Sequence, residues 1–129
     1  MMEENKSIHI SHPDYNIPEL TADESQGIFS IKGESYPEDC QKFYAPFSEK
    51  IIKFIENSEI EVIIEIKLTY YNTATSKVLI NLFNKIYKYS SQGKKATVRW
   101  YCDKNDSEII QDAEDFELIT GLEIEIITF

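Results

Sequence analysis

The fold is decided by residues 60–77, which read IEVIIEIKLTYYNTATSK. Apolar side chains recur at every second position from Val62 to Tyr70, which is the period of a strand with one buried face. Asn, Thr and Ser residues follow, and these types are preferred where a helix begins because their oxygens accept the free N–H groups of the first turn. The stretch therefore predicts a strand over residues 60–71 that runs directly into a helix over residues 73–91.

Similar periodicities extend on both sides of this junction. They predict strands over residues 17–21 and 28–32, joined as a hairpin, and further strands over 95–101 and 122–129. They also predict helices over 39–57 and 105–119, the second capped at Asn105 or Asp106 and ended by Gly121. The order β-β-α-β-α-β-α-β predicts an α/β fold with a mixed, mainly parallel sheet and an antiparallel N-terminal hairpin.

The two central strands alternate between apolar and polar residues, whereas parallel strands covered on both faces are usually apolar throughout. We therefore expect the helices mainly on one face of the sheet, with the other face partly open. A solvated surface is the simpler interpretation of that face, and a partner surface is the functional one, because Tyr and Arg are enriched in interface hot spots. The side chains expected there are Glu65, Lys67, Thr69, Tyr71, Thr97, Arg99 and Tyr101.

Length and charge limit the classes of function. A chain of 129 residues is expected to form one domain over 1–129, with residues 1–6 disordered. Its net charge of -10 argues against nucleic acid and anionic membranes as partners. The N-terminus has no apolar signal-peptide core, and no apolar run approaches the ~20 residues of a membrane span, so we expect a cytoplasmic location.

No residue pattern indicates a cofactor or a catalytic centre. His9 and His12 lie three residues apart without a third histidine or a cysteine, so a surface pair is expected rather than a metal site. The four glycines are isolated, and no Gly-rich phosphate loop is present. The remaining enzymatic alternative is a site at the C-terminal ends of the strands, near Asp103 and Tyr71.

The hydroxyls of Thr73, Thr75 and Ser76 admit two interpretations. One is ordinary helix capping around Asn72. The other is a phosphorylation switch, because a helix N-terminus favours phosphate and Lys77 lies one turn beyond Thr73 on the same face. An exposed charge at a helix N-terminus contributes only about 0.3–1 kcal/mol, whereas reversing a two-state equilibrium takes about 5.5 kcal/mol. We therefore expect phosphate to exclude a partner and to leave the fold unchanged.

Five blocks occur in a characteristic order: residues 33–38 (GESYPE), 43–46 (FYAP), 67–77 (KLTYYNTATSK), 98–101 (VRWY) with Asp103, and 114–116 (EDF). From about Pro18 onward the chain resembles the SiaC family of bacterial regulatory phosphoproteins. That resemblance implies an α/β fold similar to the anti-sigma-factor antagonists (STAS-like). It also implies reversible threonine phosphorylation, by a dedicated serine/threonine kinase and a metal-dependent PP2C-type phosphatase.

The resemblance further implies that the unphosphorylated form binds and activates a diguanylate cyclase, which raises cyclic di-GMP and promotes biofilm formation. The modified threonine falls on Thr73, with Thr75 and Ser76 as secondary candidates. The alternative from the residues alone is a phosphorylation-independent interaction module that uses the open sheet face. The residues expected to contact a partner are Tyr71, Asn72, Lys77, Arg99 and Tyr101.

Overall fold

The computed structural model describes residues 8–10 and 17–129, which form six strands and three helices. The strands are β1 (Ile8–Ile10), β2 (Glu19–Asp23), β3 (Ile28–Ser35), β4 (Val62–Tyr71), β5 (Ala96–Cys102) and β6 (Ile124–Thr128). The helices are α1 (Cys40–Asn57), α2 (Thr73–Ser90) and α3 (Ser107–Thr120). The expectations for residues 1–6 and for His12 lie outside the described residues.

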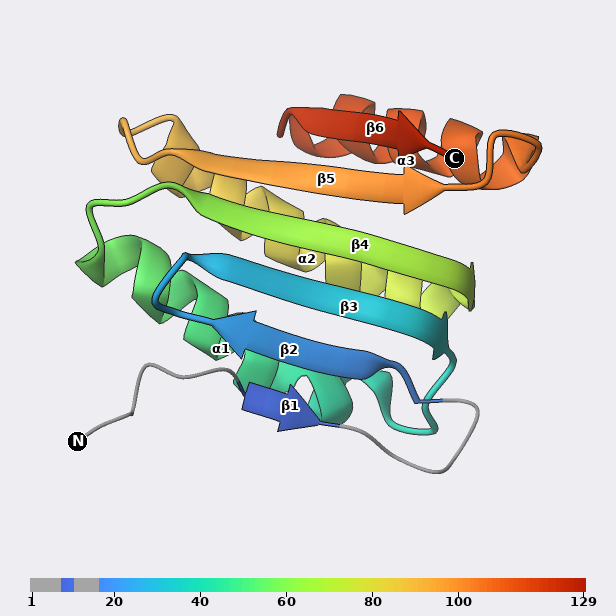
Figure 1. Ribbon diagram of the computed structural model, residues 1–129, viewed down its shortest axis with the longest axis horizontal. Helices are drawn as coiled ribbons and strands as arrows, with labels where there is room; N and C mark the ends of the chain where they lie inside the picture. Colours follow the sequence, from blue (N-terminus) through green and yellow to red (C-terminus); the bar gives the residue numbers. More distant parts are fainter. Residues whose placement is uncertain (1–7, 11–16) are drawn as a thin grey trace.

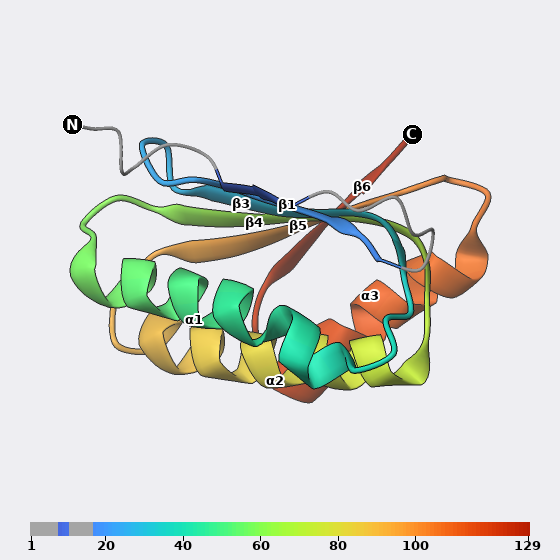
Figure 2. The ribbon, with the colours of Figure 1, turned by 90° about the horizontal axis from the view of Figure 1, so that it is seen from below.

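The six strands form one sheet in which their spatial order follows the chain, from β1 to β6 (Figure 1). The β1–β2 and β2–β3 pairs are antiparallel, and the three later pairs are parallel. Right-handed crossovers that advance in one direction place their helices on one face of a sheet. Figure 2 shows α1, α2 and α3 together on that face. The predicted α/β class, N-terminal hairpin and one-sided helix layer are confirmed, and β1 is an additional strand.

The core fills the space between the sheet and the helix layer. Strand β4 contributes its alternate residues from Val62 to Leu68, all at most 1% exposed. Helix α2 buries the apolar residues of one face, namely Val78, Leu79, Leu82, Phe83 and Ile86. The apolar periods of the strand and the helix therefore meet in one hydrophobic cluster, which stabilises the junction between them.

A β-bulge at Thr69 corrects the prediction for the last residues of β4. Leu68 pairs with Gly33 of β3, but Glu34 pairs with Tyr70, so Thr69 is an extra residue without a partner in the register. One extra residue reverses the alternation that follows it. Tyr71 therefore packs on the helix side, and Tyr70 is 54% exposed. The expectation that Tyr71 lies on the open sheet face is wrong for this reason.

The boundaries of the other elements follow their capping residues. Asp106 caps α3 by accepting a hydrogen bond from the N–H of Ile109 at 3.1 Å, and Gly121 ends this helix with a φ of 79°.

Cys40 and Cys102 are buried free thiols. None of the helices in the described part of the chain is both long enough and apolar enough to cross a membrane.

Candidate functional site

The site lies where β4 ends and α2 begins. Asn72 is the N-cap of α2, and its side-chain Oδ1 accepts a hydrogen bond from the N–H of Thr75 at 2.9 Å. The N–H of Asn72 donates to the carbonyl oxygen of Ser35, the last residue of β3, at 3.2 Å. These two bonds fix the start of the helix against the end of the neighbouring strand. The capping interpretation of Asn72 is therefore correct, and it leaves Thr73 without a capping role.

Thr73 is the first residue of α2, and it is exposed. Within the described part of the chain, its hydroxyl makes no hydrogen bond. Lys77, one turn further along, is also exposed. Residues four apart on a helix lie on the same face, so the ammonium of Lys77 and the hydroxyl of Thr73 share the solvent-facing side of the first turn.

Thr75 and Ser76 have different environments from Thr73. Thr75 is fully buried, and its hydroxyl donates to the carbonyl oxygen of Ser35 at 2.9 Å. Ser76 is half-buried, and its hydroxyl donates to the carbonyl oxygen of Asn72 at 3.4 Å. Of the three hydroxyls that the sequence grouped together, only that of Thr73 is both exposed and free of a hydrogen bond in the described structure.

Tyr71 links the site to α3. Its hydroxyl donates to Asp112 of α3 at 2.6 Å, and its ring packs edge-on against Trp100 with centroids 6.0 Å apart. Burial, and then the carboxylate of Asp112, raises the pKa of Tyr71. The Asp103 side chain instead accepts a hydrogen bond from the N–H of Asn105. Tyr71 and Asp103, the two residues of the enzymatic alternative, are thus engaged in separate hydrogen bonds with different partners.

Alkaline pH should destabilise the fold through the buried tyrosines. Burial raises the pKa of Tyr44, as it does that of Tyr71, so both stay protonated when the tyrosines of the unfolded chain ionise near pH 10. Above about pH 10 the unfolded state binds fewer protons than the folded state, so the free energy of unfolding falls as pH rises. Below about pH 10 the two tyrosines are protonated in both states, and their contribution to the free energy of unfolding is fully present.

Urea unfolding at pH values of about 8 and 11 measures this loss. The double variant Tyr44→Phe/Tyr71→Phe lacks both titrating hydroxyls. Because the hydrogen bonds of these hydroxyls are lost, the variant should be less stable at the lower pH. Because the titrating groups are lost, its free energy of unfolding should depend less steeply on pH. An equally steep alkaline decline in the variant would show that other groups cause the loss.

Loss of the cap should be measurable separately. Asn72→Ala removes the oxygen that accepts the N–H of Thr75 and should lower the free energy of unfolding by about 1 kcal/mol, whereas Asn72→Asp keeps an acceptor and should cost much less. Thermal unfolding of the two variants gives the comparison. Equal losses in both would mean that the amide contributes through some contact other than the cap.

Arg99 and Tyr101 lie on the sheet face that no described helix covers. The Nε of Arg99 lies 3.3 Å from the Oε1 of Glu125 on β6, and the ammonium of Lys67 lies 5.0 Å from the ring centre of Tyr101. On this polar surface Lys67, Arg99 and Tyr101 are half-buried and Glu125 is exposed. The structure therefore separates the predicted partner residues into two groups, Asn72 and Lys77 at the helix start and Arg99 and Tyr101 on the open face.

An aromatic pair beside the helix start is missing from the sequence-based site. Tyr70 and Tyr36 are both exposed, and their rings meet edge-on with centroids 5.4 Å apart. The bulge at Thr69 turns Tyr70 outward and so creates this pair. The only signal in the sequence is the adjacent Tyr70 and Tyr71, which does not reveal which ring faces solvent.

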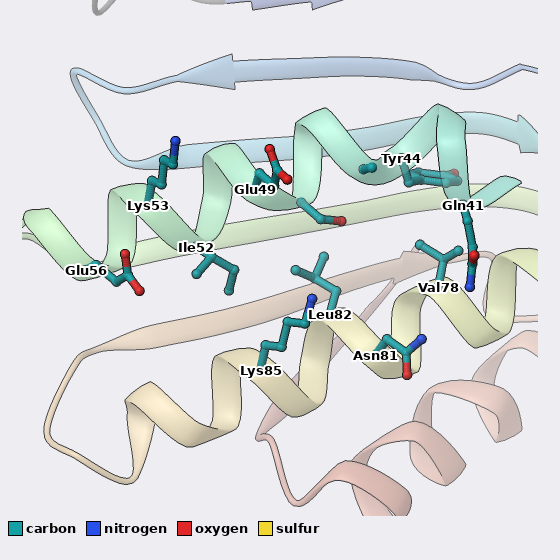
Figure 3. Close-up of a pocket in the computed structure, with 12 residues that line it drawn as sticks. Gln41, Tyr44, Glu49, Ile52, Lys53, Glu56, Val78, Asn81, Leu82 and Lys85 are labelled. Carbon is teal, nitrogen blue, oxygen red and sulfur yellow. The ribbon is translucent and has the colours of Figure 1, made fainter.

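A groove of about 660 Å³ runs between α1 and α2 on the outer face of the helix layer (Figure 3). Its floor is apolar and includes Ile52, Val78 and Leu82, and Glu49 and Lys85 contribute charged groups from the two helices. Thr73 is not among the residues that line it. The groove is therefore a feature of the helix layer, separate from the exposed hydroxyl at the start of α2.

Known proteins similar to this chain agree with the fold. A crystal structure of apo-SiaC from Pseudomonas aeruginosa superimposes with a TM-score of 0.84 at 20% identity, covering 95% of this chain and 99% of that chain. The SiaC chain solved in complex with the diguanylate cyclase SiaD, which it activates, gives a TM-score of 0.87 at 20% identity with the same coverage. Both comparisons show the same fold.

The sequence comparisons cover the site itself. A protein of Pseudomonas aeruginosa strain UCBPP-PA14, without an assigned function, is 22% identical over 99 residues, which are 77% of this chain and 79% of that protein. The profile described as "SiaC family regulatory phosphoprotein" matches residues 11–129, and so includes the β4–α2 junction and its hydroxyls. The chain therefore belongs to the SiaC family of regulatory phosphoproteins.

Proposed function

We propose that this protein is a non-enzymatic switch in which Thr73 is phosphorylated by a serine/threonine kinase and dephosphorylated by a PP2C-type phosphatase. The unphosphorylated form binds and regulates a diguanylate cyclase, and through it cyclic di-GMP and biofilm formation. The observation that carries the proposal is the contrast between the exposed, unbonded hydroxyl of Thr73 and the sealed hydroxyl of Thr75. Kinase and cyclase both consume nucleoside triphosphates, so the proposal places the switch in the cytoplasm.

The chemistry of the helix start supports Thr73 as the acceptor. The free N–H groups and the positive dipole end of α2 favour a phosphate on its first residue. Lys77 supplies a cation on the same face. These groups offset part of the new charge of about -1.5 to -2 without any rearrangement of the core. The domain that results carries the same fold with a different surface.

The phosphate changes the surface at the start of α2, and this change controls whether the partner binds. The relative named above is a SiaC that activates a diguanylate cyclase, and a partner of that class would dock against the unmodified helix start and the Tyr36–Tyr70 pair beside it. A phosphate buried in that contact without a matching cation would cost several kcal/mol. Phosphorylation thus removes the partner, and dephosphorylation restores it.

Phosphopeptide mapping tests the acceptor. The protein is incubated with an extract of its host cells and ATP, and trypsin then releases residues 68–77, which contain Thr69, Thr73, Thr75 and Ser76. Fragmentation should place the phosphate on Thr73, and Thr73→Ala should lose it. Thr69→Val, which removes another exposed hydroxyl of the same peptide, should keep it. Undiminished phosphorylation of Thr73→Ala would remove Thr73 from the proposal.

A second candidate is a phosphorylation-independent interaction module. The observation that favours it is the open sheet face, where Lys67 lies over Tyr101 and Arg99 lies beside Glu125. For this candidate, Arg99→Ala should abolish partner binding and Thr73→Asp should not. The reverse pattern supports the switch, so one binding assay on the two variants separates the functions.

A further inference from the structure

Beneath the helix start, a chain of buried hydroxyls connects α1, β3 and α2. Ser35 and Thr75 are fully buried, and Tyr44 is 1% exposed. The Oγ of Ser35 lies 2.6 Å from the hydroxyl of Tyr44 and 2.9 Å from the Oγ1 of Thr75. The Sγ of Cys40 lies 3.5 Å from the same Thr75 oxygen. Residues from three elements therefore converge on one side chain of the first turn of α2.

One assignment of the hydroxyl protons satisfies every bond of this hydrogen-bond chain at once. A carbonyl oxygen only accepts, so the hydroxyl proton of Thr75 goes to the carbonyl of Ser35. The Ser35 hydroxyl must then donate to Thr75, and the Tyr44 hydroxyl must donate to Ser35. With the thiol of Cys40 as a second donor, Thr75 uses its one proton and both of its oxygen lone pairs.

This arrangement has two consequences for the helix start. The Thr75 hydroxyl is fully buried and hydrogen-bonded, so a kinase cannot reach it. The carbonyl of Ser35 accepts from both the Thr75 hydroxyl and the Asn72 N–H, so one residue before Thr73 and one two positions after it are tied to one atom of β3. Thr73 is held between two fixed points and is directed to solvent.

We propose that Thr75 is a specificity-determining and positioning residue for the phosphorylation of Thr73, acting through the Tyr44–Ser35–Thr75 chain. The proposal rests on the function proposed above. Because the Thr75 hydroxyl is buried, the kinase can reach only the other hydroxyls of this cluster. The bonds of Thr75 also fix the first turn of α2, so that the exposed Thr73 is presented in one conformation. Thr75 itself takes no part in phosphoryl transfer.

Two substitutions at one position test the role of the hydroxyl. Thr75→Val keeps the shape but leaves the Ser35 hydroxyl without its acceptor, whereas Thr75→Ser keeps the chain. Thr75→Val should lower kcat/KM for phosphorylation at position 73 about tenfold, and Thr75→Ser should stay within about twofold of the unmodified chain. In Thr75→Ser, the phosphate should remain on Thr73, because the hydroxyl at position 75 stays buried and bonded.

A matched variant separates positioning from loss of stability. Thr120 is a buried threonine at the end of α3, and its hydroxyl donates to the carbonyl of Phe116 at 2.7 Å. Thr120→Val should destabilise the domain and leave phosphorylation at Thr73 unchanged. If Thr75→Val does not fold, Tyr44→Phe removes the first donor of the chain while Thr75 keeps its bonds to Ser35, and it should give a smaller decrease in rate.

Amide exchange followed by NMR gives a readout that needs no kinase. Thr75→Val should speed exchange of the amides at positions 75 and 76 about tenfold and leave those of β5 and β6 unchanged. If the protein without any substitution takes up no phosphate, that result would contradict the proposed function. A phosphorylated chain whose rate and acceptor are the same in Thr75→Val would overturn the role of Thr75 alone, as would phosphate at position 75 in Thr75→Ser.

Discussion

Thr73→Asp should strongly weaken binding of the proposed diguanylate cyclase partner while the domain stays folded. A carboxylate buried in the contact without a partner costs about 2 kcal/mol or more, which weakens binding at least about thirtyfold. The same carboxylate at the first position of α2 contributes about 0.3–1 kcal/mol to stability, because it meets the positive end of the helix. Titration calorimetry with a candidate diguanylate cyclase from the host measures the first effect, and thermal unfolding of the same protein measures the second.

Ser107→Asp is the matched control for this substitution. Ser107 is the first residue of α3 and is exposed, so the variant carries the same charge at the same position of a different helix. It should bind the cyclase with unchanged affinity. Equal loss of binding in both variants would show a general effect of negative charge on an already acidic protein, and a collapsed fold in Thr73→Asp would show that Thr73 has a structural role.

Trp100→Ala should cause a large loss of stability, about 3–5 kcal/mol in the free energy of unfolding. The Trp100 ring is fully buried on β5 and lies edge-on to Phe116 of α3, with centroids 5.3 Å apart, and to Tyr71 of β4. Its loss leaves a cavity beside the residue that precedes the cap of α2. Urea unfolding followed by circular dichroism gives the difference in free energy.

Two further variants give this prediction its controls. Trp100→Phe should cost much less, because it keeps ring contacts and removes an indole N–H that has no hydrogen-bond partner in the described structure. Phe129→Ala truncates a ring that is 69% exposed and should stay within about 0.5 kcal/mol of the unmodified chain. A Trp100→Ala variant as stable as Phe129→Ala would contradict the packing described for β5.

The order of elements could be predicted because the apolar periods are strong and local. Helix α2 spans Thr73–Ser90, within one residue of the predicted helix, and Gly121 ends α3 where the sequence predicts the stop. The bulge at Thr69 could not be predicted, because two adjacent tyrosines fit either face of a strand equally well. A register shift depends on pairing with β3, which no local pattern contains.

The sequence predicts the hydroxyl cluster at the start of α2 but not which of its hydroxyls is exposed. Composition treats Thr73, Thr75 and Ser76 as equivalent hydroxyls. The helical period distinguishes them, because Thr75 stands three and four residues before the buried Val78 and Leu79 and so continues their stripe. That signal identifies Thr75 as buried, but not its partners, because Ser35, Cys40 and Tyr44 lie 31 to 40 residues earlier in the chain.

Site-resolved mass spectrometry of the protein isolated from its native host tests the central claim most directly. We expect two populations that differ by the mass of one phosphate, with the phosphate on Thr73 and the cyclase bound only to the unmodified population. Phosphate on another residue, or equal recovery of the cyclase with both populations, would contradict the switch.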